Sequence, residues 1–600
     1  MPKERYIQKS LTAVIQNKSK SNNKDFSRRL KRSNIETHSK SICTKSFSIV
    51  LTHSSSIKKE ELKELVYIFI CGEIYETEKY SSEYLMQDYL RYGTDFIKKL
   101  EGSFIILIID NRNDSISIIT DRYNTKKLYF VKIDNSYLLS TSIYNFPREF
   151  FNIDYAGLAS YLINNAIYDN HTLLEGVRIF EKSSIHQIER NKITARKYWE
   201  YIFTAEYEGR KENELEQEMY ELLVKSVKKR IDQKRKVYLS LSGGWDSRGL
   251  AALLSSNEIN FQNVECFTYN YGNVLSESEA DIAGRIAKKS GYRYRVVQSY
   301  RGDVLHCIRA NANQGSGKAH FCGETDAWEE LSDEFSSSQE NVLFTGQLIN
   351  GSFERFYGDQ NRALSRSEIY TSSLLKPYIH LFENDQAEKI LKAWDQLYLK
   401  LLNKLTKYSD MTDVLDYIDF DQKVPHVYNQ WREDFQMPFI DVANPYYDYD
   451  FIDFNSKLPS KYRHSKTMLV KCLSKNFPEY FTIPRNNPKI VKRVNWENEL
   501  ILQKEEIQNF LYNQSSMLDI IIPPGNIVHF INNSKKDKKY TKSIAKGVHK
   551  LMYKILPGYP KFIEKLPFGK KIIGKTGNFV NTNMDYFIEK ILILRYFLKN

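Results

Sequence analysis

The residues most suggestive of a binding or catalytic role form one short run, Ser242-Gly243-Gly244-Trp245-Asp246-Ser247. Its two glycines separate an apolar, β-prone run from a helix-forming run, which predicts a tight strand–turn–helix connection. Such a turn directs backbone N–H groups at one point, where the helix dipole adds partial positive charge. The serines add hydroxyl donors. Asp246 beside an anion site suits a divalent cation that is shared with a phosphate group.

The pattern S-G-G-x-D-S resembles the pyrophosphate loop of the N-type ATP pyrophosphatases, which cleave ATP between its α and β phosphates to adenylate a substrate. The alternative is a plain strand–turn–helix with a polar tip. We favour the pyrophosphate loop because five motif positions and both flanking elements agree. The resemblance implies that Ser242, Gly243, Gly244 and Ser247 hold the pyrophosphate of ATP and that Asp246 holds Mg²⁺.

Hydrophobic periodicity places the loop in an alternating β/α pattern. We expect a helix over 212–233 and another over 278–290, with strands over 237–241, 264–269, 294–298 and 342–345. This alternation predicts a parallel sheet whose ligand site lies at the carboxyl ends of its strands. Residues 45–200 instead hold short β-prone runs between Asn/Asp/Gly turns, which predict hairpins in stacked sheets.

Length and composition suggest an ordinary globular protein. Six hundred residues with 42% hydrophobic content are enough for several packed domains. The six cysteines show no C-x-x-C spacing, so reduced thiols are expected. The N-terminal residues lack the apolar stretch of a signal peptide, and the longest apolar runs are too short for a membrane span. We therefore expect a soluble, cytoplasmic protein without a transmembrane segment.

Positive charge is concentrated near the two ends of the sequence. Residues 1–40 hold 11 Lys/Arg and 3 acidic residues, and residues 535–600 hold 16 and 4. The chain as a whole has a net charge of +13, so the stretch between these ends is mildly acidic. Basic ends suit an acidic partner, although a solvated Lys-rich surface is the simpler interpretation. No recognised nucleic-acid motif accompanies the charge, so a nucleic-acid partner is not expected.

Motifs in both halves of the chain resemble the asparagine synthetase B family, whose members join an N-terminal glutamine-hydrolysing domain of the Ntn type to a synthetase domain. In the first half, Cys71-Gly72-Glu73-Ile74-Tyr75 resembles N-G-E-I-Y, and residues 121–129 resemble R-D-x-x-G-x-x-P-L-Y. In the second half, residues 279–291 fit E-x-x-x-A-x-x-x-A-x-x-x-G, and Pro445-Tyr446-Tyr447-Asp448 resembles P-F-L-D. The order of these motifs is more specific than any one of them.

The resemblance implies a fold and a set of domain boundaries. We expect an Ntn-like sandwich of antiparallel sheets over 45–200, then a parallel-sheet α/β ATP-pyrophosphatase domain with a helical C-terminal part over 210–490. A flexible basic segment is expected over 1–44, and a basic C-terminal extension over 491–600. The resemblance also implies that Thr268 and Tyr269 line the adenine pocket, with Gly346 beside the nucleotide. Lys466 corresponds to a lysine that neutralises pyrophosphate.

The glutaminase nucleophile of the family is absent. That nucleophile is a cysteine at position two, and this chain has Pro2 there. Thiolate attack on glutamine needs the sulfur together with the free α-amine as base. Cys71 replaces the asparagine that helps to form the oxyanion hole, and we interpret it as a small buried residue rather than a substitute nucleophile. We therefore expect no glutamine hydrolysis.

A further departure falls on the synthetase site. Where the family has S-G-E-G-x-D-E, this chain reads Thr345-Gly346-Gln347-Leu348-Ile349-Asn350-Gly351. Gln347 keeps the shape of the catalytic Glu but cannot act as a base. Asn350 keeps one oxygen ligand for a second contact to Mg²⁺, with less attraction than Asp. Glu324, Asp326 and Glu354 are nearby in sequence and could compensate for the lost charge.

Two functions follow from these observations. The first is an ATP-dependent ligase that adenylates a substrate carboxylate, releases pyrophosphate and joins the acyl group to ammonia or a substrate amine. Without a glutaminase it resembles β-lactam synthetases and lasso-peptide cyclases, so a peptide or natural-product substrate is favoured over free aspartate. The alternative is a catalytically inactive descendant that binds a nucleotide or a partner. The intact pyrophosphate loop favours the enzyme.

Overall fold

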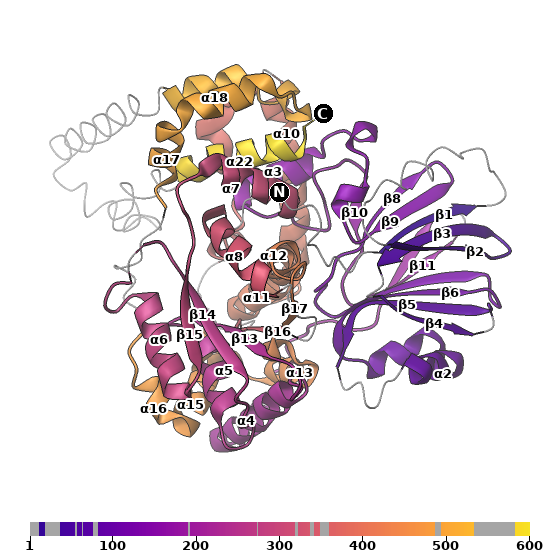
Figure 1. Cartoon of the computed structure of the whole chain (residues 1–600). Coiled ribbons are helices and arrows are strands. Elements are labelled where there is room, and N and C mark those ends of the chain that lie inside the picture. Colours follow the sequence, from indigo (N-terminus) through magenta and orange to yellow (C-terminus); the bar gives the residue numbers. More distant parts are fainter. Residues whose placement is uncertain are drawn as a thin grey trace.

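In the computed structural model of the chain, the described residues are 11–17, 37–54, 57–62, 64–75, 82–189, 192–272, 274–318, 322–335, 341–347, 359–383, 385–485, 494–532 and 583–599. They form an N-terminal part of stacked antiparallel sheets and a larger C-terminal part built on a parallel sheet and many helices (Figure 1).

Two antiparallel sheets form the N-terminal part. The first has the strand order β10-β8-β9-β1-β3-β2, and the second has the order β12-β11-β7-β6-β5-β4. The strands are β1 (Leu11–Asn17), β2 (Thr37–Cys43), β3 (Phe47–Ser54), β4 (Lys58–Leu62), β5 (Val66–Ile74), β6 (Gly102–Asp110), β7 (Ser115–Thr120), β8 (Tyr129–Ile133), β9 (Ser136–Ser140), β10 (Arg178–Ile179), β11 (Ser184–Ile188) and β12 (Ile193–Lys197).

Strand β5 shows why the sheets stack as they do. Alternate residues of a strand point to opposite faces of its sheet, and both faces of β5 are apolar. Tyr67 and Phe69 belong to the core between the two sheets. Val66 and Ile68 belong to a second core on the other face, together with residues of helix α2 (Ser82–Tyr92) and the 3₁₀ helix η3 (Gly93–Lys99).

The C-terminal part is built on a five-stranded parallel sheet with the order β15-β14-β13-β16-β17. Its strands are β13 (Val237–Ser240), β14 (Val264–Asn270), β15 (Arg293–Gln298), β16 (Val342–Thr345) and β17 (Asp441–Ala443). Central strand β13 is buried on both faces, with Leu239 in one core and Tyr238 in the other. Burial on both faces explains its continuous run of apolar residues.

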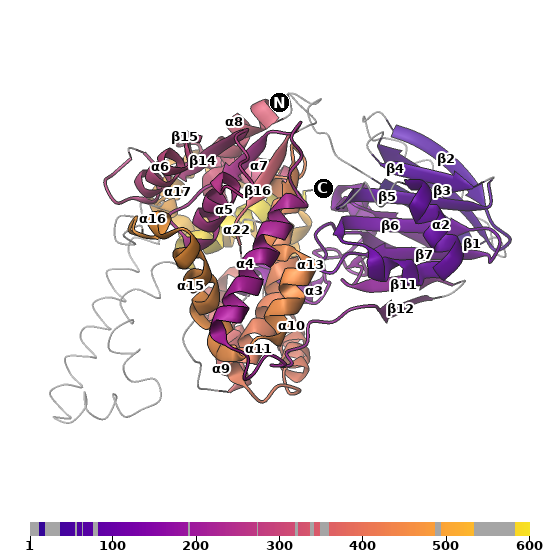
Figure 2. The same ribbon diagram turned by 90° about the horizontal axis from the view of Figure 1, so that it is seen from below.

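Helices cover both faces of this sheet. Helices α4, α13 and α15 lie side by side in Figure 2 and share one core with the sheet, as do α5 and α6. Helix α8 packs on the opposite face. These helices are α4 (Glu212–Lys228), α5 (Trp245–Ser255), α6 (Glu279–Ser290), α8 (Thr325–Phe335), α13 (Tyr449–Lys457) and α15 (Thr467–Asn476).

Most of the remaining helices of the described chain share another large core, to which β1, β8 and β9 also contribute, and several of them lie at the top of Figure 1. The members of this core include α3 (Tyr155–Asn164), α7 (Val304–Gln314), α9 (Gln360–Arg366), α10 (Gln386–Lys404), α11 (Met411–Ile418), α17 (Trp496–Leu502), α18 (Lys504–Asn513) and α22 (Asn583–Phe597). Shorter elements connect these layers: the π-helical segment η8 (Asp419–Tyr428), α12 (Asn429–Phe435), α14 (Ser460–Arg463) and α16 (Pro478–Phe481).

Two predictions about the ends of the chain need correction. The flexible segment predicted over 1–44 is wrong for residues 11–17 and 37–43, which form β1 and β2. Strand β1 lies between β9 and β3, and its apolar residues are buried, although the surrounding sequence is rich in Lys, Ser and Asn. Residues 494–532 and 583–599, predicted to lie in a C-terminal extension, pack into the helical core, where α22 buries its apolar run 591–594. Most of the basic tail, 533–582, lies outside the described residues.

Among the described residues, helix length and hydropathy nowhere reach what a membrane span requires.

The position of β1 leads to a stability prediction. Ile15 is 1% exposed in the core between the sheets, whereas its neighbour Gln16 is only partly buried. Replacing Ile15 by Ala should lower the free energy of unfolding of the N-terminal part by about 2–5 kcal/mol, since a cavity is left in the core. Gln16→Ala is the matched control and should cost less than about 1 kcal/mol. Urea denaturation measures both, and equal small losses would mean that β1 is not a core strand.

Candidate functional site

The loop between β13 and α5 is held by its own hydroxyl groups. The backbone N–H of Ser242 donates to Oγ of Ser247 at 3.0 Å, and the N–H of Gly244 donates to Oγ of Ser242 at 3.2 Å. Gly244 is the N-cap residue of α5, so the free N–H groups of the first helical turn face the loop. The loop therefore presents a preformed, partly positive site for an anion.

The end of β16 presses directly against this loop. A Cβ atom on Gly346 would lie 2.6 Å from the backbone nitrogen of Ser247 and 2.8 Å from its Cα, so only glycine fits here without displacing the backbone. Strands β13 and β16 pair in parallel, which brings their carboxyl ends to the same edge of the sheet. The sheet thus places Gly346 beside the loop.

Asp246 and Lys466 form an ion pair at the start of α5. Nζ of Lys466 lies 2.7 Å from Oδ1 and 2.6 Å from Oδ2 of Asp246. Lys466 precedes α15 in a left-handed conformation with a φ of +57°, as does Ser465 with a φ of +50°. Tyr446 donates its hydroxyl to the backbone oxygen of Asp246 at 2.8 Å. A cation and an acid that the sequence assigns to one site therefore meet in the structure.

Gln347 is fixed by two residues that the sequence analysis did not single out. Arg432 donates to Oε1 of Gln347 at 2.8 Å, and Asn444 donates to its backbone oxygen at 3.0 Å. Arg432 is 3% exposed, and within the described chain no carboxylate lies within ion-pair distance of it. Replacing the family's Glu by Gln at this position therefore leaves a buried guanidinium paired with a neutral amide. Asn350 and Glu354 lie outside the described residues.

Two carboxyl groups flank the loop on its other side. Glu279 lies at the start of α6, and the backbone N–H of Gly243 in the loop favours its ionised form. Glu324 follows strand β15 and helix α7 in the chain, and burial raises the pKa of its carboxyl to about 8, with the charge of Glu279 adding to the rise. Desolvation also raises the pKa of Glu279, against the opposing effect of the Gly243 backbone N–H. Carboxyl groups with raised pKa values are typical of functional sites.

Buried polar atoms without partners mark the same edge of the sheet. Among the described residues, Oγ1 of Thr345 and Oε2 of Glu324 are buried without a hydrogen bond. Thr268 and Tyr269 lie at the carboxyl end of β14, next to β13, as the adenine-pocket prediction requires. Buried groups left unsatisfied are costly, so they fit a site that gains partners when a polar ligand binds.

Arg248 ties the loop to residues 480–484 through hydrogen bonds to backbone oxygens, an arrangement that we call the Arg248 clamp. Its guanidinium donates to the backbone oxygens of Gly243, Tyr480, Ile483 and Pro484, at 2.6–3.2 Å. Burial lowers its pKa to about 10, and nearby arginines contribute to this lowering. The guanidinium also lies over the ring of Trp245, which stacks on Phe481. No motif signals this role, because the four acceptors are backbone atoms, three of which are more than 230 residues away in the chain.

The N-terminal half shows no accessible sulfur at Cys71. This residue is 1% exposed and packs in the core between the two sheets. Next to it, Gly72 has a φ of +122°, and a Cβ there would lie 2.0 Å from the oxygen of Ser103. Pro2 lies outside the described residues.

The two halves are joined by a partly buried charged contact. Arg122 donates to both carboxylate oxygens of Asp453, at 2.9 and 3.0 Å, and lies over the rings of Trp199 and Tyr449. A small cavity at this junction is lined from the first half by Ser103 and Tyr123, and from the second half by Asn429, Arg432, Asn444 and Tyr447. The residues that hold Gln347 therefore border the interface between the halves.

Comparison with known families agrees with this architecture. Residues 61–199 match the model of the glutamine amidotransferase domain, and residues 218–483 match the model of asparagine synthase. The amidotransferase match falls on the antiparallel sheets, and the asparagine synthase match begins before the parallel sheet and includes all five of its strands. The fold is therefore an Ntn-like arrangement of antiparallel sheets followed by a parallel α/β domain with a helical C-terminal part.

The similar proteins are distant. Amidase chyE of Penicillium rubens is 25% identical over 262 residues, which cover 39% of this chain and 39% of chyE. The glutamine-hydrolysing asparagine synthetase 2 of Bacillus subtilis is 22% identical over 474 residues, covering 71% of this chain and 62% of that enzyme. Among solved structures, glutamine phosphoribosylpyrophosphate amidotransferase from B. subtilis aligns with 70% of this chain and 100% of its own, at 9% identity and a TM-score of 0.22.

The Arg248 clamp leads to a prediction. Arg248→Lys keeps the charge, but one ammonium group cannot reach four carbonyl oxygens held in fixed directions. The variant should lose about 1–3 kcal/mol of unfolding free energy, measured by urea denaturation, because buried acceptors lose their donors. The exposed Arg285→Lys is the control and should stay within about 0.5 kcal/mol. Equal behaviour of the two variants would contradict a clamping role.

Proposed function

We propose that the protein is an ATP-dependent amide-forming ligase that works without glutamine hydrolysis. A carboxylate oxygen of the substrate attacks the α-phosphorus of ATP, and the bond to the β-phosphate oxygen breaks, giving an acyl-adenylate and pyrophosphate. The nitrogen of an amine or ammonia then attacks the acyl carbon, AMP leaves, and one proton is released. The observation that carries the proposal is the preformed loop with Asp246 and Lys466 at its mouth.

The residues of the loop suit this chemistry. Negative charge develops on the leaving pyrophosphate, and N–H groups of the loop and of the first turn of α5 are fixed donors for it. The ammonium group of Lys466 is close enough to neutralise the same charge. Because Lys466 now pairs with Asp246, a cation that binds Asp246 would release Lys466 toward pyrophosphate. Both charged side chains are thus already positioned in the site before the substrates bind.

Magnesium is the cation that this donor set fits. The Asp246 carboxylate is a hard oxygen donor, and the amide oxygen of Asn350 is our proposed second ligand. Bound there, Mg²⁺ would shield the phosphate charges during attack by the carboxylate. Thr345, Gly346, Thr268 and Tyr269 are the proposed walls of the adenosine pocket, and the unpaired oxygens at this edge are available to a nucleotide.

The nitrogen source in this proposal is a free amine or ammonia. The buried thiol of Cys71 argues against this cysteine as a glutaminase nucleophile. Among carboxylate substrates, we favour a peptide or natural-product precursor over free aspartate. The reason is that Gln347 lacks the negative charge of the glutamate that it replaces in the resemblance. The basic ends of the chain would suit an acidic substrate or partner.

A second candidate is an inactive descendant that binds nucleotide or a partner protein. Two observations favour this alternative. Asp246 is already paired with Lys466, and Gln347 is neutral, so the site has less negative charge with which to bind a metal–nucleotide complex. ATP–pyrophosphate exchange separates the two functions. Exchange that depends on one carboxylate compound supports the ligase, and the absence of exchange with every candidate supports the inactive descendant.

The first prediction of the ligase proposal concerns Asp246. Asp246→Ala should reduce carboxylate-dependent AMP formation at least 100-fold, because the metal ligand and the partner of Lys466 are both removed. The fold should persist, which circular dichroism verifies. AMP formation at the natural rate in this variant would refute the assignment of the site.

The second prediction concerns Cys71. Cys71→Ser changes a core residue that is far from any proposed chemistry, so amine-dependent product formation should remain within about twofold of the natural chain. Glutamine should not replace the amine as nitrogen source in either protein. A loss of activity in Cys71→Ser, at unchanged thermal stability, would instead make this thiol part of the mechanism.

A further inference from the structure

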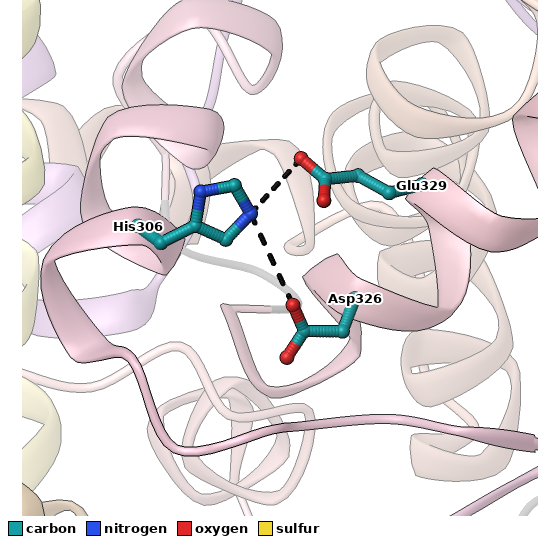
Figure 3. A group of neighbouring side chains, drawn as sticks. All are labelled: His306, Asp326 and Glu329. Carbon is teal, nitrogen blue, oxygen red and sulfur yellow. Dashed lines mark ion pairs between the residues drawn. The ribbon is translucent and has the colours of Figure 1, made fainter. Parts of the chain in front are cut away.

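Three metal-ligating side chains converge outside the nucleotide site, between α7 and α8 (Figure 3). His306 lies in the first turn of α7, and Asp326 and Glu329 lie three residues apart on one face of α8. Nε2 of His306 is 2.9 Å from Oε1 of Glu329 and 3.9 Å from Oδ1 of Asp326. One ligand atom from each residue falls within a sphere in which all separations are at most 4.8 Å.

An ordinary ion pair accounts for only part of this cluster. A single imidazole nitrogen carries at most one proton, so Nε2 can donate to one carboxylate and not to both. It lies close to Glu329 and beyond hydrogen-bond distance from Asp326. The nearest arginine on the same surface, Arg301, directs its guanidinium to Glu330 at 2.6 Å instead. Within the described chain, the two carboxylates of the cluster therefore have no lysine or arginine within ion-pair distance.

Hydrogen bonds behind the cluster fix the positions of its ligands. Oδ2 of Asp326 accepts the backbone N–H of Arg301 at 2.6 Å, which leaves Oδ1 facing the imidazole. Asp303 caps α7 by accepting the backbone N–H of His306 at 2.8 Å. Asp326 is 7% exposed, whereas His306 and Glu329 are more open. A buried, oriented carboxylate with two more accessible ligands leaves a route by which an ion can enter.

The separations suit a small divalent ion. Zinc bonds to nitrogen and oxygen of about 2.0–2.1 Å in tetrahedral geometry require ligand atoms roughly 3.3 Å apart. The measured separations, 2.9 and 3.9 Å, lie on either side of that value. Small side-chain rotations of Glu329 and His306 would bring the two nitrogen–oxygen separations to that value. We propose that His306, Asp326 and Glu329 bind one divalent transition-metal ion, with water as the fourth ligand.

Such an ion would stabilise the start of α8 next to the proposed nucleotide site. Asp326 lies in the first turn of α8, two residues after Glu324, whose carboxyl reaches the edge of the nucleotide site. A metal that joins α7 to α8 fixes the start of α8 and so the position of Glu324. The inference is independent of the ligase proposal, because it concerns binding of the metal alone.

Calorimetric titration of Zn²⁺ into the full chain, without nucleotide, tests this inference. Because other histidines and cysteines can bind zinc, the readout is the difference between the natural chain and its variants. His306→Ala should remove one equivalent of the tightest binding, and Glu329→Gln should weaken that binding at least tenfold. Glu330→Gln is the matched control, since this acid follows Glu329 directly but pairs with Arg301, and it should change the affinity less than twofold.

Mg²⁺ in millimolar excess should not displace the zinc, because a histidine ligand favours the transition metal over magnesium. Identical stoichiometry and affinity in the natural chain and in His306→Ala would overturn the proposal. So would equal weakening by Glu329→Gln and Glu330→Gln, since that result would reflect general surface charge. Thermal melts without metal verify that the variants remain folded.

Discussion

The ion pair between Asp246 and Lys466 is the interaction on which the account of the site rests. Its two residues are 220 positions apart, and each lies at the start of a helix that packs on the same face of the parallel sheet. Their meeting requires the register of β13 and β16, the glycine at 346 that lets the strand end touch the loop, and the left-handed turn that precedes α15. A change in any of these would move one charge away from the other.

Around this pair, two further groups of the site carry little negative charge. Gln347 is held by a buried arginine, and the raised pKa of Glu324 leaves its carboxyl largely protonated near neutral pH. The site therefore offers Asp246 as its main charged ligand. This arrangement suits a reaction in which the incoming amine is delivered by the substrate, and it also explains why an inactive descendant is the main competing interpretation. The N-terminal half contacts the second half through Arg122 and Asp453.

Much of the fold could be predicted from the sequence, since strands β13 to β16 fall where hydrophobic periodicity places them. The short β-prone runs of residues 45–200 likewise form the stacked antiparallel sheets that they predict. Strand β1 could not, because seven residues within a polar, lysine-rich stretch show too little pattern by themselves. The order of the motifs indicated which residues share the site. Arg248, Arg432 and Asn444 were not predicted, because their roles depend on backbone atoms and partners that only the folded chain brings together. The metal cluster also depends on how α7 packs against α8, which the sequence pattern does not indicate.

Calorimetric titration of ATP into the natural chain and into Asp246→Ala, with and without Mg²⁺, tests the central claim most directly. The account predicts that ATP binds the natural chain in a magnesium-dependent manner and that Asp246→Ala loses at least tenfold in affinity together with the magnesium dependence. Absence of ATP binding to the natural chain, or equal binding to both proteins, would contradict the assignment of a working pyrophosphate site.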